Sequence, residues 1–255
     1  MSAGLVRVEC DGGVARVVLD HPPLNILTRA LMHSLRQALV RLEADQSVRV
    51  VLLSATGRHF SAGADVAEHL PPSYQELIPE FLETVLALDR FPLPVIAAVR
   101  GRCLGGGFEL VLGADLIVAA ETAVFGQPEI TLGVVPPAAA ALLPGRCARG
   151  LAAELVLTGD PVSAVEAAGA GLVRRVVAEA ELEPVAQGLA QRIARHSRAA
   201  LGVAKRSLRL RWGGQEASSL AAAGDEYVHT LMATADAVEG LNAFLEKRSP
   251  AWSHR

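Results

Sequence analysis

The sequence predicts an α/β fold with a mostly parallel β-sheet. Short continuous apolar runs, such as residues 48–54 and Val95–Val99, have the length and composition of strands that are buried on both faces. Segments with apolar residues at helical spacing lie between these runs. The order strand, helix, strand recurs along the chain, and this order is typical of parallel sheets that are covered by helices.

The N-terminal part begins with a β-hairpin signal. Residues 5–10 and 14–20 are rich in β-branched side chains, and Asp11-Gly12-Gly13 between them favours a tight turn. Pro22-Pro23 then ends the second strand. A helix is expected over residues 28–43, with Thr28 as its cap. Four leucines of this segment are spaced to form one apolar face: Leu31, Leu35, Leu39 and Leu42.

The middle of the chain repeats this alternation. The expected helices cover residues 73–89 and 106–113, and a further helix starts in the alanine-rich stretch 137–141. The expected strands are Val95–Val99, Leu116–Ala120 and 173–177. A parallel core built in this way extends to about residue 196.

Helices dominate the remainder of the chain. They are expected over residues 181–197, Arg198–Arg211, 216–232 and 237–248, and Gly213-Gly214 marks the clearest boundary between two of them. We therefore divide the chain into a core, residues 1–196, and a C-terminal helical region, residues 197–255.

Composition excludes several classes of protein. Apolar residues make up 51% of the 255 residues and aromatic residues 4%, so the core consists mainly of Ala, Val and Leu. The formal charge of −3 gives no general attraction for nucleic acid. No apolar run reaches membrane-spanning length, and the N-terminus lacks the features of a secretion signal, so we expect a cytoplasmic protein. The three cysteines and seven histidines show no metal-binding spacing, and no metal is expected.

Two glutamates follow segments in which the backbone is unusually accessible. Glu109 comes after Gly105-Gly106-Gly107, which opens a helix with free N–H groups, and Glu129 follows Gly126-Gln127-Pro128. Two carboxylates beside backbone donors can transfer protons next to a stabilised oxyanion. Taken alone, Glu129 is equally compatible with a cap at the start of a surface helix.

A third segment, residues 58–65, follows the strand at 48–54. Its small residues allow a ligand to approach the main chain, at the strand end where open α/β sheets bind ligands. An ordinary strand-to-helix turn capped by Asp65 is the alternative interpretation. Ser61 within it lacks the Gly-x-Ser-x-Gly pattern of a nucleophile and has no evident histidine partner.

These segments resemble the crotonase superfamily, also called the enoyl-CoA hydratase/isomerase family. The similar segments span nearly the whole chain: 22–27, 60–66, 104–110, 125–133, 157–159, 164–176 and 239–250. The resemblance implies a spiral of ββα units followed by a C-terminal helical region that serves oligomerisation and covers the active site. It also implies trimers or pairs of trimers that act on acyl thioesters of coenzyme A, with no bound prosthetic group.

The resemblance also assigns roles to residues. The backbone N–H groups of Ala62 and Gly106 would bind the thioester oxygen. Glu109 would deprotonate water for attack on the β-carbon, and Glu129 would protonate the α-carbon. Contacts with coenzyme A would come from Leu24, Ala62, Gly63, Ala64, Asp65, Val66 and Lys247. For Lys247, a solvated position at the end of a helix is the alternative.

The implied function is hydration of an α,β-unsaturated acyl-CoA, because both glutamates are present and a simple isomerase can work with one. The alternatives are a Δ-isomerase and a hydratase of cyclic dienoyl thioesters. Residues 60–71 and Pro136-Pro137 resemble the branch of the family that hydrates cyclic dienoyl thioesters. A non-catalytic protein that binds acyl-CoA or RNA is a further alternative. A strip of basic residues would support RNA binding: Arg192, Arg195, Arg198, Lys205, Arg206, Arg209 and Arg211.

Overall fold

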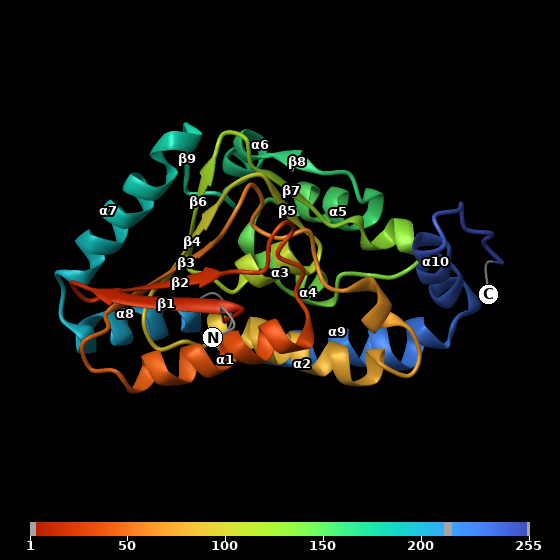
Figure 1. The fold of residues 1–255 in the computed structure, drawn as a ribbon, viewed down its shortest axis with the longest axis horizontal. Helices are drawn as coiled ribbons and strands as arrows, with labels where there is room; N and C mark the ends of the chain where they lie inside the picture. Colours follow the sequence, from red (N-terminus) through yellow and green to blue (C-terminus); the bar gives the residue numbers. More distant parts are fainter. Residues whose placement is uncertain (1–3, 212–215, 254–255) are drawn as a thin grey trace.

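A six-stranded sheet forms the centre of the computed structural model, which describes residues 4–211 and 216–253 (Figure 1). Its strands, in spatial order, are β1 (Val6–Asp11), β2 (Val14–Leu19), β3 (Val50–Ala55), β4 (Val95–Val99), β6 (Leu116–Ala120) and β9 (Arg175–Val177). Only the β1–β2 pair of this sheet is antiparallel, and the other neighbours are parallel. The predicted α/β class and the mostly parallel sheet are confirmed.

The N-terminal hairpin is formed as the sequence predicts. Asp11 pairs with Val14 across the turn, so the loop consists of Gly12 and Gly13 alone. The first helix, α1 (Arg29–Ala44), is capped by the hydroxyl of Thr28, which accepts a hydrogen bond from the N–H of Leu31.

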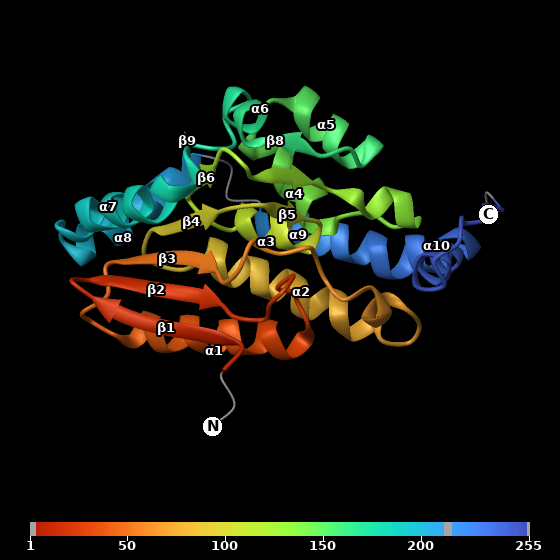
Figure 2. The same ribbon diagram turned by 45° about the horizontal axis from the view of Figure 1, so that its top comes forward.

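Helices cover both faces of the large sheet, as Figures 1 and 2 show. Helix α7 (Leu182–Ala194) packs on one face, and α1, α2 (Tyr74–Asp89) and α3 (Gly106–Leu112) contribute to the core on the other. The alternation of side chains along β3 illustrates this division. Leu52 belongs to the apolar cluster that includes α7, and Leu53 belongs to the cluster that includes α1, α2 and α3.

A small second sheet lies next to the segments that carry Glu109 and Glu129. It consists of β5 (Arg102–Leu104), β7 (Val124–Gly126) and β8 (Val162–Ser163), none of which the sequence pattern predicts. Three helices follow in this part of the chain: α4 (Pro137–Arg146), α5 (Arg149–Thr158) and α6 (Ala164–Gly169). Of these, only the start of α4 is predicted. The strands are too short to show a sequence period, and their pairing with each other stabilises them instead.

The C-terminal region departs from the prediction in one important place. Helix α8 (Arg198–Arg211) has the expected bounds, but the segment 216–232 is not one α-helix. Helix α9 (Glu216–Asp225) is followed by a π-helix, Glu226–Thr230, and by a 3₁₀ turn, Leu231–Ala233. The last helix, α10 (Ala235–Leu245), starts earlier than expected because Thr234 caps it. The predicted boundary at Gly213-Gly214 lies outside the described residues.

No helix in the described part of the chain is both long enough and apolar enough to cross a bilayer.

Candidate active site

Glu109 and Glu129 line the same cavity, which has a volume of about 70 Å³. The small sheet explains why residues so far apart in sequence meet. Strands β5 and β7 are parallel neighbours, with Leu104 paired to Gly126, and the N–H of Gly105 donates to the carbonyl of Gly126 at 2.9 Å. Each strand leads directly into the short helix that carries one of the glutamates.

Glu109 is held by the N-terminus of α4. Its side chain is buried, and its Oε1 accepts hydrogen bonds from the N–H groups of Ala138 at 2.7 Å and Ala139 at 2.9 Å. Pro137 occupies the first position of α4, where its fixed φ suits a helix start. The free amides and the positive end of the helix dipole stabilise a negative charge on Glu109.

Glu129 lies in a 3₁₀ helix, η2 (Pro128–Leu132), with its carboxyl group against the backbone of Gly105. A Cβ atom at Gly105 would lie 2.5 Å from Oε1 of Glu129. Oε2 of Glu129 is buried and has no hydrogen-bond partner among the described residues. The carboxyl group therefore has an unused polar atom at the cavity.

The surroundings of the two glutamates shift their pKa values by different causes. Burial raises the pKa of Glu109 to about 7, against the lowering effect of the Ala138 and Ala139 amides. Burial and then the charge of Glu109 raise the pKa of Glu129 well above its usual value. The two amide donors therefore favour the ionised form of Glu109, and burial favours the protonated form of Glu129.

The expectation that Ala62 supplies an oxyanion donor is wrong in this structure. The N–H of Ala62 already donates to the carbonyl of Leu24 at 2.9 Å. Ala64, two residues later, lies beside Gly106, because a Cβ at Gly106 would be 3.2 Å from the Ala64 nitrogen. Ala64 and Gly106 both line the cavity, and neither N–H has an acceptor within the described part of the chain.

Ser61 fixes the loop that presents Ala64. Its hydroxyl donates to the carbonyl of Asn25 at 2.8 Å and accepts from the N–H of Gly63 at 3.2 Å. Gly107 permits this packing, since a Cβ there would lie 2.5 Å from that of Ser61. Ser61 thus has a structural role, and its oxygen is not available as a nucleophile.

The remaining residues proposed to contact coenzyme A differ in their relation to the cavity. Gly63, Ala64 and Val66 line the cavity. Asp65 caps the 3₁₀ helix η1 (Val66–His69), because its side chain accepts a hydrogen bond from the N–H of Ala67. This agrees with the alternative interpretation of residues 58–65 as a turn capped by Asp65. Leu24 and Lys247 do not line the cavity, although Leu24 is adjacent to Ala62 through the backbone bond described above.

Sequence reasoning missed two contributions to this site. Tyr227 and Leu241 line the cavity, and although a cover from the C-terminal region is expected, these two residues are not among the predicted site residues. A single tyrosine in an apparently regular helix gives no signal of such a role. The helix start at Pro137 is visible in the sequence, but its contact with Glu109 is not.

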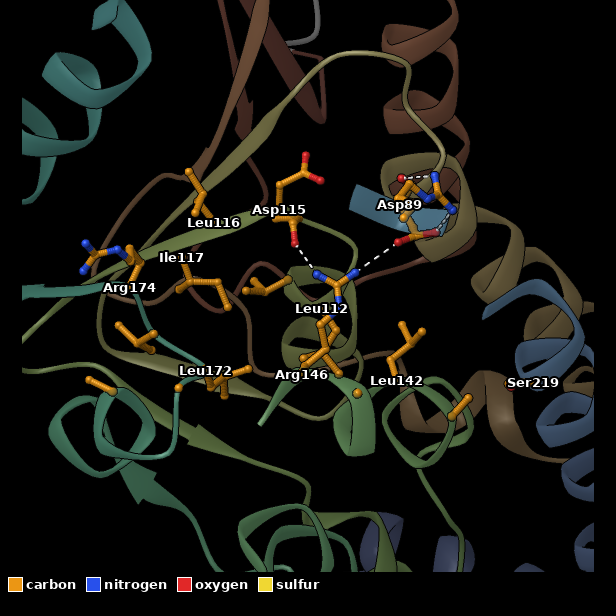
Figure 3. Close-up of a pocket in the computed structure, with 18 residues that line it drawn as sticks. Asp89, Leu112, Asp115, Leu116, Ile117, Leu142, Arg146, Leu172, Arg174 and Ser219 are labelled. Carbon is orange, nitrogen blue, oxygen red and sulfur yellow. Dashed lines mark hydrogen bonds and ion pairs between the residues drawn. The ribbon is translucent and has the colours of Figure 1, made fainter. Parts of the chain in front are cut away.

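A larger cavity of about 700 Å³ lies elsewhere and contains neither glutamate (Figure 3). In it, Arg146 donates to Asp89 at 3.0 Å and to the carbonyl of Ala114 at 2.8 Å. Arg209 also pairs with Asp89. These three charged side chains are therefore engaged with each other. Among the described residues, no group of three or more His, Cys, Asp or Glu side chains is placed to hold a metal ion.

A parallel α/β core with two buried carboxyl groups beside open backbone amides defines a class of enzymes that act on activated carbonyl compounds. The family model for enoyl-CoA hydratase/isomerase matches residues 9–255. The chain therefore belongs to the enoyl-CoA hydratase/isomerase family, within the crotonase superfamily.

Individual relatives agree with this assignment. The chain is 39% identical over 250 residues to the cyclohexa-1,5-dienecarbonyl-CoA hydratase of Thauera aromatica, covering 98% of this chain and 96% of that protein. It is 35% identical over 258 residues to the carnitinyl-CoA dehydratase of Proteus mirabilis (strain HI4320), covering 98% of each. The crystal structure of an enoyl-CoA hydratase from Mycobacterium avium subsp. paratuberculosis K-10 superposes with a TM-score of 0.87 at 28% identity, over 98% of this chain and 99% of that one.

Proposed function

We propose that this protein adds water across the double bond of an α,β-unsaturated acyl-CoA thioester. The observation that carries the proposal is the pair Glu109 and Glu129 in one cavity, with the first held by two amides and the second retaining a proton. Hydration needs both a group that accepts a proton from water and a group that donates one to carbon.

The backbone amides of Ala64 and Gly106 would bind the thioester oxygen. Negative charge accumulates on this oxygen as the enolate forms, and two fixed N–H donors in a buried site stabilise that charge. The assignment replaces Ala62 with Ala64 and retains Gly106. It rests on the free N–H groups of both residues and on their contact with each other.

The bond changes follow from the protonation states. Ionised Glu109 removes a proton from water, the water oxygen forms a bond to the β-carbon, and the π electrons move onto the thioester oxygen. The enolate then collapses as its α-carbon takes the proton of Glu129. Because both carboxyl groups face one small cavity, water and proton reach the same face of the alkene.

Separate Glu109→Gln and Glu129→Gln variants test these roles. Each is expected to lower kcat for hydration by about 10³-fold, since each removes one proton-transfer group. Loss of the conjugated thioester chromophore reports the rate, and Glu43→Gln on the exposed side of α1 is the matched control. Wild-type rates in both active-site variants would disprove the assignment.

The acyl group is a second part of the proposal. Similarity to a cyclohexa-1,5-dienecarbonyl-CoA hydratase favours a cyclic dienoyl thioester as one substrate. A panel of linear and cyclic enoyl-CoA compounds, followed by mass spectrometry, tests this. A mass increase of one water identifies hydration, whereas a new isomer of unchanged mass identifies the Δ-isomerase alternative.

Binding of RNA has little support in the structure. Three members of the basic strip are bound to other groups of the protein. Arg198 donates to the carbonyls of Glu43 and Val48, and Lys205 pairs with Asp115 at 2.7 Å. Arg209 is the third, paired with Asp89 as described above. The strip is therefore not a continuous positive surface of the kind that binds a phosphate backbone.

Four expectations complete the proposal. They are a trimer or dimer of trimers, a cytoplasmic location, and residues 197–255 as the region that serves oligomerisation. Contact of Lys247 and Leu24 with coenzyme A belongs to the same group. Light scattering on the purified protein measures the oligomeric state, and truncation after residue 196 is expected to reduce it together with activity.

A further inference from the structure

Tyr227 combines burial with an unused polar group. Its side chain is 1% exposed, and its hydroxyl has no hydrogen-bond partner among the described residues. It belongs to the π-helix Glu226–Thr230, in the segment between α9 and α10 (Figure 1). Single π turns inside helical segments occur frequently at functional sites. A buried hydroxyl without a partner is unfavourable for stability, so a role with a ligand would explain why it is present.

Tyr227 lines the same cavity as the two glutamates, whose charges act on its phenol. Tyr227 lines the cavity together with Glu109, Glu129, Ala64 and Gly106. Burial and the charges of Glu129 and Glu109 raise the pKa of Tyr227 well above its usual value. The phenol therefore keeps its proton under all conditions in which the enzyme would act, and it is a permanent hydrogen-bond donor.

The other polar side chains of the cavity are poor alternatives as donors. Oε1 of Glu109 accepts from two amides, and the proton of Glu129 is the one that passes to the α-carbon, so Glu129 is not a lasting donor to water. The ring of His69 contacts Asp65 O through Nδ1 at 2.8 Å, so Nδ1 carries the proton and Nε2 is an acceptor. Burial lowers the pKa of His69, which keeps the ring neutral.

A buried water molecule needs two to four polar partners, and its two lone pairs and two hydrogens impose a direction on each. The carboxyl oxygens of the cavity can accept its hydrogens. A donor is needed for one lone pair, so that only the second lone pair remains to attack carbon. Tyr227 is the side chain in the described lining that supplies such a donor without losing its proton.

We propose that the hydroxyl of Tyr227 donates a hydrogen bond to the water molecule that is added to the β-carbon, and so orients it. The inference rests on the proposed hydratase function. The O–H bond of Tyr227 does not break, since the proton of water passes to Glu109 and the α-carbon takes its proton from Glu129. In the reverse direction, the same hydrogen bond would stabilise the departing hydroxyl.

Tyr227→Phe removes the donor and preserves the ring. Two reactions are measured on this variant: hydration of crotonyl-CoA, and exchange of the α-hydrogens of butyryl-CoA in deuterated water. Exchange requires the oxyanion amides and a carboxylate but no water at the β-carbon. Loss of one hydrogen bond to the reacting water is expected to lower kcat for hydration about 10- to 100-fold. Exchange should stay within about twofold of the wild-type rate, with an equal or higher Tm.

The chain offers a matched control, because Tyr74 is its only other tyrosine and does not line the cavity. Tyr74→Phe should change neither reaction. Equal losses of hydration and exchange in Tyr227→Phe would assign a purely structural role and overturn the proposal. An unchanged hydration rate would overturn it as well, while the proposed function would stand. Failure of the wild-type protein to hydrate any enoyl-CoA would overturn the function and, with it, the role of Tyr227.

Discussion

The backbone N–H of Ala138 donates a hydrogen bond of 2.7 Å to Oε1 of Glu109, which joins the N-terminus of α4 to the carboxyl group on α3. Ala139 adds a second such bond at 2.9 Å. Glu129 lies against Gly105, the N-cap of α3, and its Oε2 has no hydrogen-bond partner among the described residues. Two carboxyl groups in one cavity therefore differ in acidity, and this difference separates the base from the acid.

Glu109→Gln is expected to stabilise the protein while it lowers kcat. The folded-state pKa of about 7 exceeds the ordinary value of 4.5, so above pH 4.5 folding must overcome the cost of ionising a buried carboxyl group. The cost grows as pH rises from 4.5 to 7 and is about 3 kcal/mol at higher pH. The glutamine side chain of the variant has no charge to bury.

Urea unfolding at two pH values measures this effect. At about pH 8 the variant should exceed the wild type in free energy of unfolding, and near pH 4 the difference should disappear. The exposed Glu43→Gln variant should show no such gain. A destabilised Glu109→Gln protein at pH 8 would mean that the hydrogen bonds of the ionised carboxylate outweigh the cost of burying its charge.

The pH dependence of kcat/KM should be bell-shaped. Activity is expected to rise through an apparent pKa near 7 as Glu109 ionises, and to fall at higher pH as Glu129 loses its proton. His69 does not explain the acidic limb, because burial lowers its pKa, and Tyr227 stays protonated. A profile measured with His69→Gln should therefore keep the acidic limb, and its disappearance would reassign that limb to His69.

Asp89 is the partner of two arginines and is important for stability. Its side chain is 5% exposed, while Arg146 and Arg209 are 23% and 21% exposed. Asp89→Asn leaves both guanidinium groups without this negative charge and should destabilise the protein by about 2 to 3 kcal/mol. Partial exposure of the arginines keeps the loss below that of a fully buried pair.

Urea unfolding of Asp89→Asn is compared with that of Asp160→Asn, which changes an exposed residue. Only the first should lose stability. The rate of hydration at low temperature should be unaffected in both variants, since the cavity that holds Asp89 contains neither glutamate. Unchanged stability of Asp89→Asn would mean that the two ion pairs contribute nothing net.

Much of the large sheet was predictable because its strands are buried on both faces. Val95–Val99 and Leu116–Ala120 have the predicted bounds, since a continuous apolar run between polar or breaker residues leaves little choice of boundary. The small sheet was not predictable. Its strands have three, three and two residues, and such short segments become strands only through their partners.

The site was predictable at the level of residue types and only partly at the level of geometry. The two glutamates were identified because each follows an open stretch of backbone. Ala62 and Ala64 are both small residues in one loop, and the sequence does not show which N–H is free. The hydrogen bond from Ala62 to Leu24 decides this, and it depends on a tertiary contact.

Gly105 connects the geometry of the small sheet to the position of Glu129. Its φ of 50° and ψ of −130° lie in a region that is open mainly to glycine, and a Cβ would lie 2.5 Å from Oε1 of Glu129. Gly105→Ala should therefore displace the carboxyl group and lower kcat by about 100-fold, because small displacements of a reacting group are costly. The strained backbone should also reduce stability by about 1 to 3 kcal/mol.

Gly188→Ala is the matched control for Gly105→Ala. Gly188 lies inside α7, and an added Cβ there meets no atom within 4 Å. This control should keep full activity and gain up to about 1 kcal/mol, since alanine favours the helix. Activity and thermal unfolding are measured on both variants. Full activity of Gly105→Ala would mean that Glu129 can move away from the backbone and still deliver its proton, so its position against Gly105 would not be essential to the reaction.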